Sequence, residues 1–226
     1  MSEMNKTIVN TETEIQDVNE INLTGRIASI YRVNRKMLLM TISTRTVSRL
    51  YRKGVPASEV YDFPTVYWYG KNSDEIEKQY KVGDIVTIEA YARLAHASNK
   101  QKENKWYQDI VGKTIETTMK QIDEGFGLQT NIGQYCSDEN EVRLSGMIKY
   151  RFEPNDKVTI LTIESCNGTH KDRVNVSLTG KNRLAVTKIH DGSHICLMGK
   201  VQTHTNDKDG KKKTTQKIVC YNIAEA

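Results

Sequence analysis

The chain has 226 residues, of which 37% are hydrophobic and 27% are charged, and its formal net charge is +5 at pH 7. This length suits one large domain or two ordinary ones. No apolar run reaches the roughly 20 residues of a membrane helix and no secretory signal peptide precedes the first element, so we predict a cytoplasmic protein without a membrane partner.

The first 17 residues are acidic, with Glu3, Glu12, Glu14 and Asp17 against a single Lys6. We predict that residues 1–17 form a flexible acidic segment. The remainder of the chain is then more basic than the total charge suggests, which favours a polyanionic partner. An ordinary solvated surface with a slight lysine excess would give the same balance.

From residue 18 the chain reads as short β-rich segments separated by turn signals. A short helix is expected from Ser73 to Tyr80, where acidic residues occupy the first turn. The expected strands lie near 19–33, 37–45, 63–70, 83–95 and 105–115. Three strands, a short helix and two further strands is the element order of the five-stranded OB barrel.

The same pattern returns in the second half of the chain. Residues 19–27 recur as residues 140–148, so that Gly25 is matched by Gly146, 121 residues later. The offset then falls to 110 between Gly70 and Gly180, which places an insertion near residues 46–62 of the first copy. The second set of elements is expected at 140–151, 156–165, 173–180, a helix at 182–190, 192–203 and 214–223.

These repeats predict the fold class and the domains. The chain is expected to be all-β, with two tandem five-stranded OB-fold barrels, each carrying a short helix between strands 3 and 4. The first domain should span 18–116 and the second 140–226. A glycine-containing linker should cover 117–139.

Alternation within the third strand distinguishes the inner from the outer face. In the second copy Val174, Val176 and Leu178 share one face, which must be the core. Aligning the copies turns Val66 and Trp68 inward, together with Pro64. The residues then expected on the outer face of the first copy are Phe63, Tyr67 and Tyr69.

Exposed aromatic side chains on an OB barrel can stack nucleobases, at about 1–3 kcal/mol per base. The candidate aromatic residues are Phe63, Tyr67, Tyr69, Tyr91, Trp106 and Tyr107. The candidate phosphate-binding residues are Arg45, Arg49, Arg52, Lys53, Arg93, Lys100, Lys102, Lys105, Lys211, Lys212 and Lys213. Two alternatives stay open: the aromatics cover a dimer interface, and the Lys211–Lys213 run is an ordinary hairpin tip. The second copy, polar at these outer positions, is expected to be a weaker binder or an assembly module.

No catalytic, metal-binding or cofactor-binding set emerges from the sequence. The cysteines lack CxxC spacing and are expected to be reduced. His190 and His194 flank a turn instead of sharing a helical face, and no Walker, GxSxG or GxGxxG motif is present. We therefore predict that the protein is not an enzyme; a nuclease built on the barrel ranks last among the alternatives.

Several segments resemble the bacterial single-stranded DNA-binding protein family, in a divergent tandem form. They are Val18–Arg26, Met40–Thr44, Phe63–Lys71 and Tyr80–Val86. The resemblance implies base-stacking aromatics at Phe63 and Tyr69 and a hairpin aromatic near Trp106. The family's other stacking tryptophans fall near Val47 and Ala97, and its acidic tail is absent here. It also implies a homodimer offering four barrels, and phages and mobile elements carry divergent versions of this kind.

The expected function is therefore sequence-tolerant binding of single-stranded DNA in replication, recombination or repair. Replication or recombination proteins would be the expected protein partners. One alternative is a protein-interaction module that serves replication through its barrels. Another is binding of single-stranded RNA, which offers the same base faces and phosphates.

Overall fold

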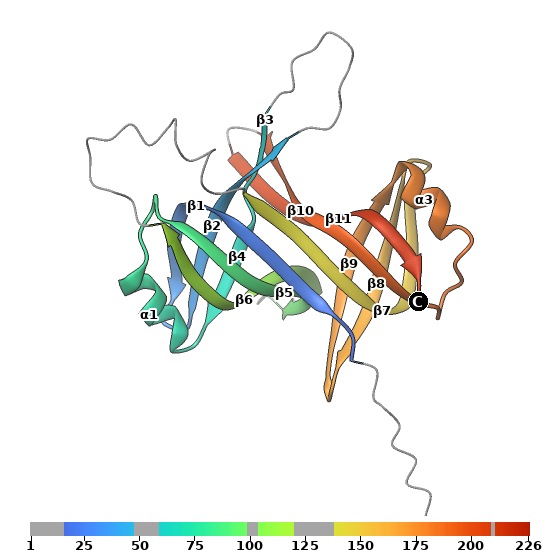
Figure 1. The fold of residues 1–226 in the computed structure, drawn as a ribbon, viewed down its shortest axis with the longest axis horizontal. Coiled ribbons are helices and arrows are strands. Elements are labelled where there is room, and N and C mark those ends of the chain that lie inside the picture. The colour runs from blue at the N-terminus through green and yellow to red at the C-terminus, as the bar shows by residue number, and fades with distance from the viewer. Residues whose placement is uncertain (1–15, 48–58, 99–103, 120–137, 209–210) are drawn as a thin grey trace, which may run out of the picture.

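The computed structural model describes residues 16–47, 59–98, 104–119, 138–208 and 211–226. Within these ranges it describes only the backbone at 46–47, 59–60, 97–98, 104–105, 119, 206–208 and 211–213. Most of the described chain is β-strand (Figure 1). Neither helix in these ranges has the length and apolarity of a membrane span.

The first copy forms a closed circuit of strands with one helix. Its elements are β1 (Asn19–Asn34), β2 (Met37–Val47), β3 (Glu59–Asp62), β4 (Thr65–Tyr69), α1 (Asn72–Gln79), β5 (Ile85–Ser98) and β6 (Asn104–Met119). Hydrogen bonding runs β1–β2–β4–β6–β5 and returns to β1, with β4 and β6 parallel. Along the chain, α1 lies between β4 and β5, the third and fourth strands of the barrel, as predicted. The short strand β3, which the sequence did not predict, pairs with β2.

The second copy repeats this circuit. Its elements are β7 (Glu139–Asn155), β8 (Val158–Asn167), β9 (His170–Thr179), α3 (Gly180–Val186), β10 (His194–Lys208) and β11 (Lys211–Glu225). The order is β7–β8–β9–β11–β10 and back to β7. The predicted all-β, OB-type fold is confirmed. Helix α3 begins and ends earlier than the predicted 182–190, and β6 continues to Met119, beyond the expected start of the linker.

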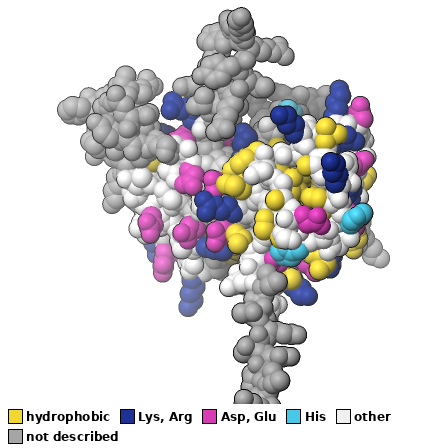
Figure 2. Space-filling view, turned by 45° about the vertical axis from the view of Figure 1, so that its right-hand side comes forward, with side chains coloured by type: hydrophobic (Ala, Val, Ile, Leu, Met, Phe, Trp, Pro, Cys, Tyr) yellow, Lys and Arg dark blue, Asp and Glu magenta, His cyan; other side chains and the backbone are white. Residues whose placement is uncertain are grey.

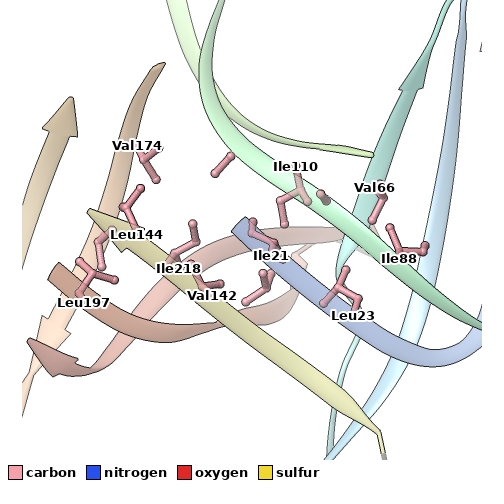
Figure 3. Packing of buried hydrophobic residues seen from close by; sticks show 14 of the residues in the cluster. Ile21, Leu23, Val66, Ile88, Ile110, Val142, Leu144, Val174, Leu197 and Ile218 are labelled. Atoms are coloured by element: carbon pink, nitrogen blue, oxygen red, sulfur yellow. The ribbon is translucent and has the colours of Figure 1, made fainter. Parts of the chain in front are cut away.

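Alternating apolar residues of both copies form a joint hydrophobic core. Val66 and Trp68 are buried beside Ile88, while Val174 and Leu178 are buried in the second copy. The inward assignment made from the repeat is therefore correct. Figure 3 shows core side chains of both copies lying side by side where β1 meets β7.

The two copies meet through a local twofold arrangement of equivalent residues. Strands β1 and β7 pair antiparallel, with Ile21 opposite Val142. These two residues hold the same place in the repeat, so each copy presents the same strand to the other, as in an isologous dimer. Asn19 bonds both backbone groups of Ala92, and Asn140 does the same to Val201 in the second copy.

Glutamine side chains fasten each third barrel strand to the other copy. The Gln216 amide accepts from the Thr65 N–H at 2.9 Å and donates to the Thr65 carbonyl at 3.1 Å. The equivalent Gln108 accepts from the Asn175 N–H at 2.7 Å. The start of β4, which carries the predicted outer aromatics, is thus positioned by the second copy.

Candidate nucleic-acid interface

One row of outward side chains crosses all five strands of the first barrel. Its members, each opposite the next in the strand register, are Tyr31, Leu39, Tyr67, Val111 and Tyr91. Residues opposite one another in a sheet share a face, and this face is the one turned away from the core. The row therefore forms an alternating aromatic and aliphatic strip on the barrel wall.

Tyr67 and Tyr69 lie ring beside ring on β4. Their ring centroids are 6.4 Å apart and their planes differ by 16°. The Tyr69 hydroxyl donates to Asp109 Oδ2 at 3.1 Å, and the Arg93 guanidinium lies 5.1 Å from the Tyr69 ring centroid. Asp109 and Arg93 are opposite each other on β6 and β5. This group, Tyr67, Tyr69, Arg93 and Asp109, is called the tyrosine platform below.

The charges of the tyrosine platform affect one another because its polar atoms are partly withdrawn from water. Burial raises the pKa of Asp109, which is only 6% exposed, against the opposing effects of Tyr69 and Arg93. Burial, followed by the nearby Asp109 carboxylate, raises the pKa values of Tyr67 and Tyr69. Burial alone would lower the pKa of Arg93, but Tyr69, Tyr91 and Asp109 together raise it, so the guanidinium stays charged.

Two further predicted aromatics lie outside the tyrosine platform on the first copy. Tyr91 lies in the row beyond Val111, and Lys113 Nζ is 5.6 Å from its ring centroid. Phe63 precedes β4 and is 41% exposed, and its N–H donates to Thr203 Oγ1 of the second copy at 2.8 Å. Phe63 therefore lies at the border between the two copies. The predicted outward direction agrees with the exposure of Phe63 and Tyr69, whereas Tyr67 is half-buried.

The hairpin of β5 and β6 carries the remaining predicted aromatics. Trp106 is 63% exposed and meets the His96 ring edge to face, with centroids 4.9 Å apart. Tyr107 is opposite Ala95, and His96 is opposite Trp106. Neighbouring residues of a strand point to opposite faces, so Trp106 and Tyr107 cannot both extend the tyrosine platform.

For most of the predicted basic residues the structure describes no side chain. Arg45 is half-buried and its N–H donates to Asp138 Oδ2 of the second copy. Arg49, Arg52, Lys53, Lys100 and Lys102 lie outside the described residues, and only the backbone of Lys105, Lys211, Lys212 and Lys213 is described. Arg93 is the predicted cation that the structure brings to the tyrosine platform.

The equivalent row in the second copy has a different composition. It contains Phe152, Ile160, Ser177, Val219 and Lys200. Serine and lysine replace Tyr67 and Tyr91, and Ser177 is buried although it was expected on the outer face. Lys200 is held by Asp62 of the first copy, with Nζ 2.7 Å from Oδ2.

The prediction omitted several residues that the structure places on the outer faces. Tyr31, Tyr150 and Phe152 are exposed, and Tyr31 and Phe152 are equivalent at the 121-residue offset. Extending the repeat alignment to this pair would have revealed Tyr31 and Phe152. Nothing in the sequence pattern singles out Asp109, because the parallel β4–β6 pairing brings it to Tyr69.

The described residues hold no group of three or more metal-ligating side chains. Cys166, Cys196 and Cys220 are free thiols, and burial raises the pKa of Cys220 to about 11. At neutral pH the Cys220 side chain is therefore a protonated packing residue, not a reactive thiolate.

Comparison with known proteins indicates the fold to which this surface belongs. No family model and no curated protein matches the sequence. A deletion mutant of the single-stranded DNA-binding protein from Thermus aquaticus matches at 11% identity over 93% of this chain and 95% of that chain, with a TM-score of 0.66. The wild-type protein matches at 9% identity over 93% and 94%, with a TM-score of 0.60. The expected fold is thus confirmed over nearly the whole chain.

Proposed function

We propose that this chain binds single-stranded DNA, with unpaired bases stacked on the outer aromatics of the first barrel. The observation that carries this proposal is the pair Tyr67 and Tyr69, whose near-parallel rings lie on the barrel wall beside the Arg93 cation. The barrel has the fold found in the single-stranded DNA-binding protein of Thermus aquaticus.

Stacking on this surface favours single strands over duplexes. A base inside a duplex already stacks on its neighbours, whereas the faces of an unpaired base are free to lie on a ring. The Tyr69 ring is held by its bond to Asp109, so little side-chain freedom is lost when a base arrives. Because all four bases have a π-face, such binding tolerates any sequence and suits strands exposed in replication, recombination and repair.

Cations beside the rings supply the phosphate contacts. Arg93 lies over Tyr69 and Lys113 over Tyr91, so each positive charge is next to an aromatic face. Phosphate neutralisation releases counterions, and affinity for a single strand then falls with salt at a slope of about −0.7 per neutralised phosphate. Phe63 extends this surface towards the second copy, where a strand leaving the first barrel would pass.

The test is a titration of oligo-dT against the wild type and a Phe63→Ala/Tyr69→Ala variant. Loss of two stacking rings should weaken binding by about 2–6 kcal/mol, at 1–3 kcal/mol per base, while thermal unfolding stays cooperative. Tyr69→Phe, which keeps the ring and removes the bond to Asp109, is the matched control and should retain most of the affinity. Equal affinity for duplex DNA, or an unchanged double variant, would contradict the proposal; a matched oligo-U series separates DNA from RNA.

A further inference from the structure

A second exposed aromatic surface lies on the second copy, on the outer face of β7 and β8. Tyr150 and Phe152 are 60% and 63% exposed, although aromatic rings of this size are usually covered. They are opposite Thr162 and Ile160, which also face away from the core. Figure 2, with the second-copy side turned forward, shows hydrophobic side chains gathered on this side of the molecule among Lys, Arg, Asp, Glu and His.

This surface lies on the second barrel, on the face equivalent to the one that carries the tyrosine platform in the first barrel. Phe152 is the first member of the second-copy row, and Tyr31 is the first member of the row that contains Tyr67. The repeat thus preserves an exposed aromatic ring at this place in both copies. Tyr150 is an addition of the second copy, because the equivalent residue of the first copy is Ser29.

The exposed aromatic rings of the second copy lie on other strands than Tyr67 and Tyr91 do in the first copy. Where the first copy has Tyr67 and Tyr91, the second has Ser177 and Lys200, and Lys200 is bound to the buried Asp62 carboxylate. The β9–β10 side of the second row therefore offers neither a ring nor an uncommitted cation. Its rings are on the β7–β8 side.

The charges around Tyr150 suit a polyanion. The Arg173 guanidinium is 5.9 Å from the Tyr150 ring centroid, the same pairing of cation and ring as Arg93 with Tyr69. Glu164 lies close by, but it is bonded to Lys149 at 3.1 Å and to Arg173 at 3.3 Å. Two cations face one carboxylate, so these three side chains together carry a net positive charge.

From these observations we propose that the second copy has its own nucleobase site, in which Tyr150 and Phe152 stack bases of a single strand and Arg173 contacts the phosphates. This inference rests on the proposed function of the first copy. It assigns the second copy a binding role through strands other than those used by the first. A single strand long enough to reach both surfaces would contact the two copies in turn.

The experiment compares the wild type with Tyr150→Ala/Phe152→Ala in the full chain, using oligo-dT of increasing length. Affinity for the longest oligomers should fall at least about tenfold, as expected from the loss of one stacked base or more. Affinity for oligomers too short to leave the first copy should stay unchanged. Leu184→Ala, which removes a similarly exposed apolar side chain from α3, is the control and should bind as the wild type does.

Two results would overturn this inference while leaving the proposed function standing. One is a Tyr150→Ala/Phe152→Ala variant that binds every length as the wild type does, while Phe63→Ala/Tyr69→Ala is impaired. The other is unchanged DNA binding with an altered sedimentation coefficient, which would make the surface a contact between copies of the chain. A wild type that binds no oligo-dT at all would refute the proposed function, and this inference with it.

Discussion

Asp17 and Asp138 make the same contact from opposite copies of the chain. Asp17 Oδ2 accepts the N–H of Cys166 in the second copy at 2.7 Å, and Asp138 Oδ2 accepts the N–H of Arg45 in the first. The two acids lie 121 positions apart in the sequence, and so do the two residues whose N–H groups they accept, Arg45 and Cys166. Each acid precedes the first strand of its own copy and ties it to the second strand of the other.

Asp17→Ala should destabilise the protein without weakening DNA binding. Besides Cys166, the buried Asp17 carboxylate is bonded to Ser145 Oγ at 3.3 Å and to His194 Nε2 at 2.6 Å. Removing it leaves these groups without their partner, at about 1–3 kcal/mol for an unsatisfied buried donor. Urea unfolding measures this loss, and Glu20→Ala, an exposed acid on the adjoining strand, should change stability little. Equal midpoints for the two variants would show that Asp17 does not hold the copies together.

The buried ion pair between Lys200 and Asp62 should behave as a coupled unit. Asp62 is 3% exposed and also accepts the Thr203 N–H at 3.0 Å. Lys200→Met removes this cation from beside the buried carboxylate, which we expect to destabilise the protein by up to about 3–5 kcal/mol. Adding Asp62→Asn to that variant should recover part of the loss, because the buried negative charge that Lys200 faces in the wild type is then removed as well. A double-mutant cycle by urea unfolding measures the coupling, and strictly additive effects would exclude it.

Gly112 is required by the position of Trp68 in the first core. A Cβ at residue 112 would lie closer to Trp68 Cη2 than two carbon atoms approach in real contacts. Gly112→Ala should therefore cost about 1–3 kcal/mol through overpacking. Trp68→Phe removes the clashing ring atoms. The double variant should therefore lose less unfolding free energy than the two single variants lose in total. Unfolding monitored by circular dichroism supplies the values, and a Gly112→Ala variant as stable as the wild type would contradict this packing.

The sequence specified which side chains face outward because a strand has a period of two. Val66 and Trp68 had to be on the opposite face from Tyr67 and Tyr69 once the second copy had shown which face is apolar. The repeat also predicted that both copies have the same order of strands and helix along the chain, since equivalent segments fold alike. These expectations needed only local spacing and one alignment.

The sequence could not specify the contacts that depend on strand register. Asp109 reaches Tyr69 because β4 and β6 pair in parallel, and Gln216 reaches Thr65 because the copies meet at β1 and β7. Both pairs are far apart in the chain, and nothing in a single sequence states which residues will be opposite each other. The buried carboxylate of the tyrosine platform is for this reason a structural finding.

Asp109 places a negative charge beside the rings that are proposed to receive DNA, so its removal should strengthen binding. In the variant Asp109→Asn the side-chain amide oxygen could still accept the Tyr69 hydroxyl, which keeps the ring in place while the repulsion of phosphates is lost. We expect this variant to bind oligo-dT more tightly at neutral pH and to need more salt for dissociation. It should also be the more stable protein, because burial raises the pKa of the native Asp109 carboxyl.

The sign of the pH dependence follows from that raised pKa. Stability contributed by the protonated Asp109 is fully present below the ordinary value of 3.8 and is lost as pH rises through the higher folded value. Bound phosphates favour the neutral carboxyl further, so wild-type affinity should increase on acidification more steeply than that of Asp109→Asn. Parallel titrations at pH 7 and pH 5 isolate this term, because the two proteins differ only at residue 109. Identical pH profiles would mean that the Asp109 charge is not felt by the bound strand.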